Sequence, residues 1–122
     1  MKKIIIVEDE AVLQKAMSIE LLSAGYQALT ASNGEAGLEL IEKEKPDLVL
    51  LDLMLPKLNG FEVLTKLKAN EATKAIPVVI LSNLGQDEDK KKGLALGAVD
   101  YYIKASTDLS EITKKVEGLI GK

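Results

Sequence analysis

The chain has 122 residues, a formal net charge of −3 at pH 7 and 47% hydrophobic residues. This length and composition are typical of one globular domain, and the slightly acidic balance argues against direct nucleic-acid binding, which needs clustered Lys and Arg side chains. The absence of cysteine and histidine excludes disulfides, thiolate metal sites, cysteine nucleophiles and the usual histidine general base. Any chemistry must come from carboxylates, hydroxyls, lysines, the backbone or a hard metal ion.

The apolar runs are too short for membrane insertion. No stretch approaches the roughly 20 apolar residues of a membrane span. The run at 4–7 is also too short for a signal peptide, and it leads directly into the acids Glu8, Asp9 and Glu10. We therefore expect a cytoplasmic protein with no membrane partner.

Five apolar runs alternate with five segments of helical spacing along the chain. The runs predict strands at 4–7, 26–31, 77–81 and 99–103, and one more that follows Pro46 and ends on Asp52. The helices fall between and after these strands, the first at 11–24 and the fourth, which is highly charged, at 87–96.

The apolar residues of the helices predict which faces pack on the sheet. Thr107 can cap the last helix. The expected core-facing residues are Val12, Ala16, Ile19 and Leu22 in the first helix, Leu38 and Ile41 in the second, Phe61, Leu64 and Leu67 in the third, and Leu109, Ile112, Val116 and Ile120 in the last.

Alternation of strands and helices at this spacing is typical of an α/β domain with a parallel sheet and right-handed crossovers. The first, third and fourth strands are wholly apolar and should be central, while the second and fifth contain polar residues and should lie at the edges. These expectations give the strand order 2-1-3-4-5, which is the doubly wound, flavodoxin-like (βα)5 arrangement.

Polar side chains follow the ends of four strands. Glu8 and Asp9 follow the first strand, Asp52 ends the third, Ser82 follows the fourth and Lys104 follows the fifth. Each alone is explained as a solvated surface group, but their coincidence at the carboxyl edge of the sheet, where such folds bind ligands, indicates a site. The carboxylates suit Mg²⁺, the lysine suits a phosphate, and together they suit a phosphoryl group with Asp52 as the nucleophile.

With these residues, the chain resembles the receiver domain of two-component response regulators over its whole length. The matching positions are Glu8-Asp9, Asp52, Met54, Pro56, Asn59-Gly60, Ser82, Tyr101 and Lys104. The resemblance implies one receiver domain over residues 1–122, phosphorylated by a sensor histidine kinase or a phosphotransfer protein and read by an output domain or an effector protein. It also implies a signalling switch whose only chemistry is its own phosphorylation and dephosphorylation.

The resemblance assigns a role to each site residue. Asp52 would accept the phosphoryl group. Mg²⁺ would be bound by Asp9 and Asp52, by the backbone carbonyl of Met54, and by Glu8 mainly through water. Lys104 would pair with the phosphoryl group.

The switch residues and the departures from the family pattern lie on the later strands. Ser82 would bond a phosphoryl oxygen in the active state, and Tyr101 would change rotamer. Ser82 stands where the family often has Thr, Asn83 replaces a usually small residue beside the pocket, and Ala105 replaces the usual proline after Lys104. That proline usually takes a cis bond, which before alanine costs about 2.5–4 kcal/mol, so we expect a trans Lys104–Ala105 bond.

Two other classes fit parts of the pattern. A magnesium-dependent aspartyl phosphatase of the dehalogenase type would carry its nucleophile after the first strand with a second Asp two residues on, whereas Met54 stands two residues after Asp52. A pseudo-receiver that only binds partners would not need Asp9, Asp52, Ser82 and Lys104 together. A small-molecule phosphodonor distinguishes the three classes by a stable adduct, free phosphate or no reaction.

Overall fold

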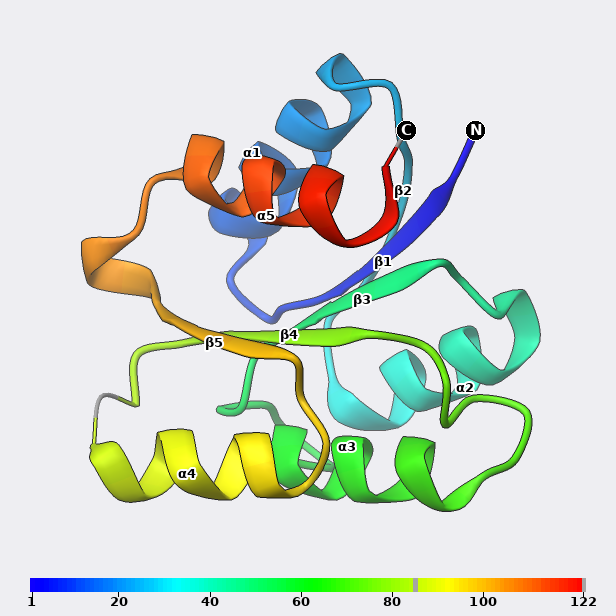
Figure 1. The fold of residues 1–122 in the computed structure, drawn as a ribbon, viewed down its shortest axis with the longest axis vertical. Helices are drawn as coiled ribbons and strands as arrows, with labels where there is room; N and C mark the ends of the chain where they lie inside the picture. Colours follow the sequence, from blue (N-terminus) through cyan, green and yellow to red (C-terminus); the bar gives the residue numbers. More distant parts are fainter. Residues whose placement is uncertain (85, 122) are drawn as a thin grey trace.

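A computed structural model describes residues 1–84 and 86–121 of the chain. Within these residues, a five-stranded parallel sheet lies between two layers of helices (Figure 1). The strands are β1 (Lys3–Val7), β2 (Gln27–Ala31), β3 (Leu48–Leu51), β4 (Val78–Ser82) and β5 (Asp100–Ile103). The helices are α1 (Ala11–Ser23), α2 (Gly34–Glu44), α3 (Gly60–Ala69), α4 (Asp87–Ala95) and α5 (Leu109–Ile120), with a short 3-10 turn, η1 (Lys104–Ser106), after β5.

The strand order is β2-β1-β3-β4-β5, and every neighbouring pair is parallel. The predicted fold class and strand order are therefore confirmed. The chain runs from β1 outward to β2 and then returns past β1 to β3. The connections that leave β1 and β3 consequently diverge, and this divergence opens a crevice between the carboxyl ends of the two strands.

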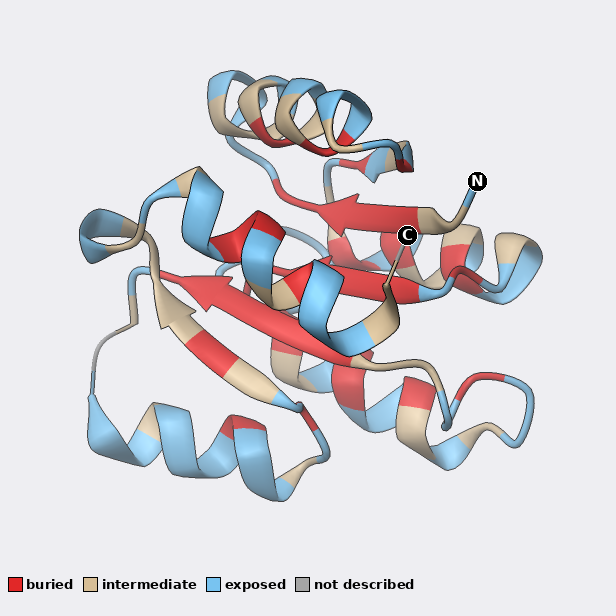
Figure 2. Ribbon diagram, turned by 45° about the horizontal axis from the view of Figure 1, so that its top comes forward, coloured by how far each residue is buried: buried red, intermediate tan, exposed pale blue. Residues whose placement is uncertain are grey.

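The central strands are buried on both faces, as their uninterrupted apolar sequences predict. Residues 4–7 of β1 are at most 1% exposed, and every residue of β3 and β4 is buried. The edge strands β2 and β5 mix buried with exposed or half-buried positions (Figure 2). Because alternate side chains of a strand point to opposite faces, the central strands contribute to two separate cores.

Each core lies between one face of the sheet and one layer of helices. α1 and α5 cover one face, and α2, α3 and α4 cover the other (Figure 1). The first core contains Ile4, Ile6, Met17, Leu21, Tyr26, Leu48, Leu50, Val79, Leu81, Ile112 and Val116. The second contains Ile5, Val7, Ile41, Val49, Leu51, Leu53, Val63, Leu64, Leu67, Val78, Ile80, Ala98 and Tyr101.

The predicted core face of α1 is wrong. Val12 is 86% exposed and Ile19 and Leu22 are more than half exposed, whereas Met17 and Leu21 are buried against the sheet. α1 carries apolar residues almost all the way round, so helical spacing alone fits more than one face. The packing of α1 beside α5 decides which face is covered.

The predicted cap of the last helix is wrong by one residue. Asp108, not Thr107, is the N-cap of α5, and it forms a capping box with Glu111. The backbone N–H of Asp108 donates to Glu111 Oε1 at 3.3 Å. The Asp-x-x-Glu pattern satisfies the helix start better than a threonine one residue earlier.

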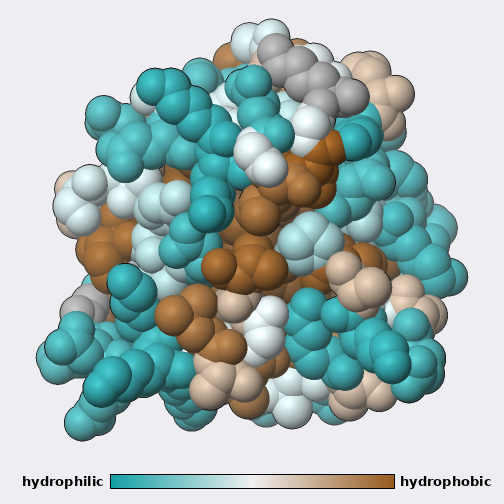
Figure 3. Space-filling model, in the orientation of Figure 1, coloured by the Kyte–Doolittle hydropathy of each residue, from teal (hydrophilic) through white to brown (hydrophobic). Residues whose placement is uncertain are grey.

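α4 is the most solvated of the helices, as its charged sequence predicts. Its buried residue is Gly93, where a Cβ would lie 2.6 Å from Ile80 Cδ1, so glycine allows α4 to approach the sheet. Hydrophilic side chains cover the corner of the molecule where α4 begins (Figure 3, lower left). Among the described helices, none combines the length and the continuous apolar sequence needed to cross a bilayer.

The orientation of α1 is testable with two adjacent leucines. Leu21 is 1% exposed and Leu22 is 55% exposed. We expect Leu21→Ala to lower the free energy of unfolding by about 2–5 kcal/mol, because it leaves a cavity in the core. Leu22→Ala should change it by no more than about 0.5 kcal/mol. Urea denaturation measures both, and equal losses would contradict this orientation.

Candidate functional site

The candidate site lies at the carboxyl edge of the sheet, in the crevice between β1 and β3. The backbone N–H of Asp52 donates to the carbonyl of Val7 at 3.0 Å, which continues the β1–β3 pairing to the point where both strands end. The backbone N–H of Glu8 donates to the carbonyl of Ala31 at 2.9 Å. The acids that follow β1 and β3 are thus held side by side by the sheet itself.

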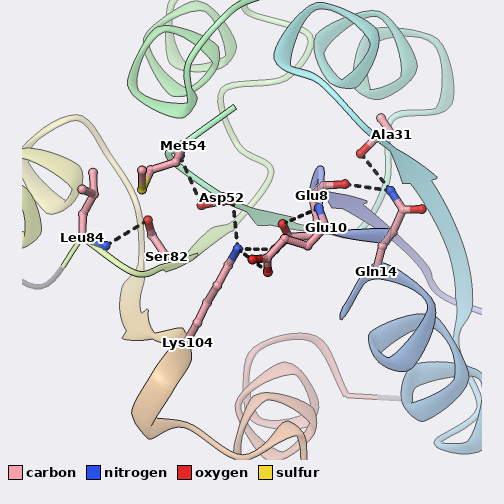
Figure 4. Close-up of polar contacts among 9 residues, drawn as sticks. All are labelled: Glu8, Glu10, Gln14, Ala31, Asp52, Met54, Ser82, Leu84 and Lys104. Atoms are coloured by element: carbon pink, nitrogen blue, oxygen red, sulfur yellow. Dashed lines mark hydrogen bonds and ion pairs between the residues drawn. The ribbon is translucent and has the colours of Figure 1, made fainter. Parts of the chain in front are cut away.

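Lys104 joins these acids into one cluster (Figure 4). Its Nζ lies 2.7 Å from Glu8 Oε1, 2.9 Å from Asp52 Oδ2 and 3.4 Å from Glu10 Oε2. The side chains of Glu8 and Asp52 are 1% and 3% exposed, and that of Lys104 is 8% exposed. Two buried carboxylates therefore share one buried ammonium group, with a third carboxylate at its outer side.

The protonation of this cluster follows from burial and pairing. Burial raises the pKa of the Glu8 carboxyl, and the hydrogen bond from Lys104 offsets this only in part. Burial would lower the pKa of the Lys104 ammonium, but its hydrogen bonds to Glu8 and Asp52 outweigh burial and raise the pKa above its ordinary value. Lys104 is accordingly a permanent positive charge between the two acids.

The carboxylate of Asp52 is oriented through both of its oxygens. Oδ1 accepts from the backbone N–H of Met54 at 3.2 Å, while Oδ2 faces Lys104. A close approach by α3 supports this turn: a Cβ on Gly60 would lie 2.3 Å from the carbonyl oxygen of Asp52, so the first residue of α3 has to be glycine. The backbone N–H of Gly60 donates to the carbonyl of Leu53 at 3.0 Å.

A pocket of about 200 Å³ opens onto this cluster. Its lining residues are Asp9, Glu10, Asp52, Met54, Asn83 and Lys104. Carboxylate oxygens of Glu8, Asp9 and Asp52 all lie within 4.8 Å of one another. Three carboxylates at this spacing, one exposed and two buried, are a donor set that suits a hard divalent cation with several water ligands.

Ser82 and Tyr101 meet at Leu84 rather than in the pocket. Ser82, at the end of β4, is buried, and its Oγ accepts from the backbone N–H of Leu84 at 3.3 Å. The ring of Tyr101 on β5 is buried, and its hydroxyl donates to the carbonyl of Leu84. Burial, followed by the charge of Asp89, raises the pKa of Tyr101, which keeps this hydroxyl a donor.

The predicted residues therefore form two groups. Glu8, Asp9, Asp52 and Lys104 converge in one cluster, and Met54 lines its pocket. Ser82 lies beside the cluster, and Leu84 links it to Tyr101 (Figure 4).

The Lys104–Ala105 peptide bond is trans, as predicted. Lys104 opens the 3-10 turn η1 and still reaches Asp52 at 2.9 Å. A trans bond at this position is thus compatible with direct contact between Lys104 and the acid.

Two residues of the site were not predicted. Glu10 is the third partner of Lys104; the run of three acids after β1 places it near the strand end but does not indicate contact with Lys104. Gln14 donates through Nε2 to the carbonyls of Glu8 and Ala31, at 2.8 and 3.2 Å, and so fixes the end of β1 from α1. A single glutamine on a helix gives no sequence signal for such a contact.

The fold and the cluster define a class: a doubly wound α/β domain with paired acids, a lysine and a small acidic pocket at the switch point of the sheet. The chain belongs to the response regulator receiver domain family, whose model, described as "Response regulator receiver domain", matches residues 4–117. It is accordingly a signalling domain.

Relatives and solved structures agree with this family. The DNA-binding dual master transcriptional regulator RpaA of Synechocystis sp. is 41% identical over 120 residues, which are 98% of this chain and 49% of that protein. The chain spans about half the length, or less, of the curated relatives it matches.

Among solved structures, the Francisella response regulator 1452 receiver domain is 28% identical, with a TM-score of 0.91 over 98% of this chain and 97% of that one. The receiver domain of sensor histidine kinase PA1611 from Pseudomonas aeruginosa PAO1, solved with a magnesium ion coordinated in the active site cleft, is 26% identical. Its TM-score is 0.88 over 99% of this chain and 98% of that one.

The role of Lys104 in holding two buried acids is testable by its removal. We expect Lys104→Met to lower the free energy of unfolding at pH 7 by about 3 kcal/mol, because Glu8 and Asp52 are left buried without a cation. Burial already raises the pKa of Glu8, and loss of the Lys104 hydrogen bond would raise it further above that of the unfolded chain, so the folded state would take up a proton more readily as the pH falls.

The difference in free energy of unfolding between Lys104→Met and the unchanged protein should therefore become smaller from pH 7 towards about pH 5. Urea denaturation at each pH measures this difference. Lys115→Met is the matched control. Lys115 pairs with Asp100 at 3.0 Å, but both side chains are about one third exposed, so the loss should be no more than about 1 kcal/mol. A pH-independent deficit for Lys104→Met would contradict this role of Lys104 in holding the buried acids.

Proposed function

We propose that Asp52 accepts a phosphoryl group and that the domain switches between signalling states when it does. The observation that carries this proposal is the buried Asp52 carboxylate at the base of an open pocket, with Lys104 Nζ 2.9 Å from its Oδ2. The positive charge already stands where the oxygens of an incoming phosphoryl group would need one.

The transfer step uses Asp52 as an unprotonated nucleophile. A carboxylate oxygen of Asp52 forms a bond to phosphorus while the bond from phosphorus to the donor nitrogen or oxygen breaks, and the electron pair leaves with the donor. No proton has to pass to or from Asp52. The lysine remains protonated throughout, because its pKa is raised by Glu8 and Asp52, and it neutralises part of the charge that the phosphoryl group brings.

Mg²⁺ is the cofactor that this donor set supports. Asp9 and Asp52 would hold it directly, together with the carbonyl of Met54. Glu8 would act mainly through water, because, unlike Asp9 and Asp52, it does not line the pocket. When bound, the ion supplies further positive charge to the phosphoryl oxygens. The magnesium ion in the cleft of the PA1611 receiver domain supports this assignment.

The self-catalysed reactions and the switch follow from the same groups. The domain would promote its own phosphorylation and its own slow hydrolysis. Ser82 would leave the N–H of Leu84 to bond a phosphoryl oxygen, and Tyr101, which holds the carbonyl of Leu84, would respond by a change of rotamer. The states would then differ on the face formed by α4, β5 and α5.

The partners we propose are a sensor histidine kinase or a phosphotransfer protein as donor, and an output domain or an effector protein as reader. RpaA, a relative of about twice this length, is named as DNA-binding, which supports an output segment outside the receiver domain. The receiver domain, residues 1–122, would not itself contact nucleic acid, in keeping with its net charge of −3. A cytoplasmic location remains part of this proposal.

The acceptor is testable by mass spectrometry with a small-molecule phosphodonor and Mg²⁺. Asp52→Asn should abolish the gain of one phosphoryl group, because an amide is not a nucleophile here. Asp47→Asn should be labelled like the unchanged protein, since Asp47 accepts from the backbone N–H of Lys3 at the opposite end of β3. If Asp52→Asn gained a phosphoryl group as the unchanged protein does, Asp52 would not be the acceptor. Release of free phosphate without an adduct would indicate a phosphatase instead.

The metal assignment is testable without any phosphoryl transfer. We expect Asp9→Asn to weaken Mg²⁺ binding by about tenfold or more, because even outer partners of a metal site contribute that much. Glu8→Gln should weaken it less. Asp47→Asn, which removes the same charge far from the pocket, should leave it unchanged. Isothermal titration calorimetry measures all three, and a titration that Asp9→Asn does not alter would rule out the proposed ligand set.

A further inference from the structure

Glu10 stands at the outer side of the acceptor pocket, in contact with its lysine. Its Oε2 lies 3.4 Å from Lys104 Nζ, and its side chain is 56% exposed. Glu10 is the N-cap residue of α1, a helix described over its whole length, but its side chain does not cap that helix. Instead, its backbone N–H donates to Glu8 Oε2 at 3.1 Å, which holds the residue against the buried acid.

Glu10 and Asp52 are close because they share one ammonium group. Nζ of Lys104 lies 2.9 Å from Asp52 Oδ2 and 3.4 Å from Glu10 Oε2. The distance between these two carboxylate oxygens is therefore no greater than the sum of the two contacts. Both also line the pocket, together with Asp9. With Mg²⁺ in place, a phosphodonor that enters meets these three carboxylates, the ammonium and the ion, so the charge of Glu10 adds a repulsion that grows with each negative charge on the donor.

Glu10 also lies at the ammonium group that the transferred phosphoryl group needs. The buried acids Glu8 and Asp52 already engage Lys104, and the more exposed Glu10 is its third carboxylate partner. A donor that approaches Lys104 from the pocket therefore comes close to the Glu10 carboxylate, whose repulsion grows with the negative charge that the donor carries. Figure 4 shows Glu10 beside Glu8, on the side of Lys104 away from Ser82.

We propose that Glu10 is a specificity-determining residue that makes the pocket discriminate against doubly negative phosphodonors. The inference rests on the proposed function, with Asp52 as acceptor, and adds to it the charge class of donor that reacts best. Donors with a net charge of −1, such as those whose phosphoryl group is bonded to a protonated nitrogen, would react faster than donors with a net charge of −2. Because Glu10 is exposed to solvent, added salt should screen the repulsion between its carboxylate and the donor.

Two small phosphodonors differ in the required way near neutral pH. Acetyl phosphate carries two negative charges and transfers its phosphoryl group to Asp52 with acetate as the leaving group, which takes the electron pair of the broken P–O bond. Phosphoramidate carries one net negative charge with a protonated nitrogen and leaves ammonia, which takes the electron pair of the P–N bond. The acceptor product on Asp52 is identical, so only the approach and the leaving group differ.

The experiment compares rates of mass gain for the unchanged protein and for Glu10→Gln with each donor and Mg²⁺. Glu10→Gln should raise the rate with acetyl phosphate by about three- to fivefold, the effect of one partly screened charge, and the rate with phosphoramidate by less than about 1.5-fold. The gain with acetyl phosphate should shrink when about 0.5 M salt is added.

Glu20→Gln is the matched control. It makes the same change of charge on α1, about 15 Å further along the helix by its rise per residue, and should alter neither rate. If Glu10→Gln fails to fold, Glu10→Ala removes the same charge and should give the same selective gain with acetyl phosphate.

Each outcome has a definite reading. A change that is equal for the two donors, or no change with either, would overturn the role of Glu10 while leaving Asp52 as the acceptor. An unchanged protein that gains no phosphoryl group from either donor would instead overturn the proposed function. A selective, salt-sensitive gain with acetyl phosphate supports both.

Discussion

The site depends on one ammonium group placed between two buried carboxylates. Glu8 and Asp52 lie side by side, almost without solvent, and would repel each other if no cation lay between them; burial and the charge of Asp52 both raise the pKa of Glu8. The ammonium group of Lys104 offsets this repulsion, because its Nζ lies 2.7 Å from Glu8 Oε1 and 2.9 Å from Asp52 Oδ2. These three residues follow β1, β3 and β5, so their meeting depends on the register of the whole sheet. The contact that stabilises the buried acids also supplies the charge that the proposed phosphoryl group would need.

Small residues bring the surrounding elements close enough for this arrangement. Gly60 lets the start of α3 reach the backbone of Asp52, and Gly93 lets α4 pack on Ile80 and on the ring of Tyr101. Because α4 buries so little else, its position depends largely on that contact and on Leu84, which Ser82 and Tyr101 both bond. On the proposed function, a rearrangement of Ser82 would act on the least buried helix of the domain.

The strand order and the convergence of the acids were predictable because both follow from patterns that burial imposes on sequence. Strands buried on both faces must be wholly apolar, which identified the centre of the sheet. Parallel strands must end at one edge, which brought Glu8, Asp9, Asp52 and Lys104 together. The exposed face of α1 and the Asp108 cap were not predicted correctly. Val12, Ile19 and Leu22 have the same helical spacing that core residues have, and Thr107 and Asp108 are both acceptable caps.

The amino-acid sequence by itself thus determined the fold class, the strand order and the residues that gather at the strand ends, because periodicity and strand-end position are local properties. Only the tertiary structure decided which face of α1 is covered, that Glu10 reaches Lys104, and that Gln14 fixes the end of β1. Those outcomes depend on how separate elements are oriented against one another. Orientation is set by packing between residues far apart in the chain, and no local pattern records it.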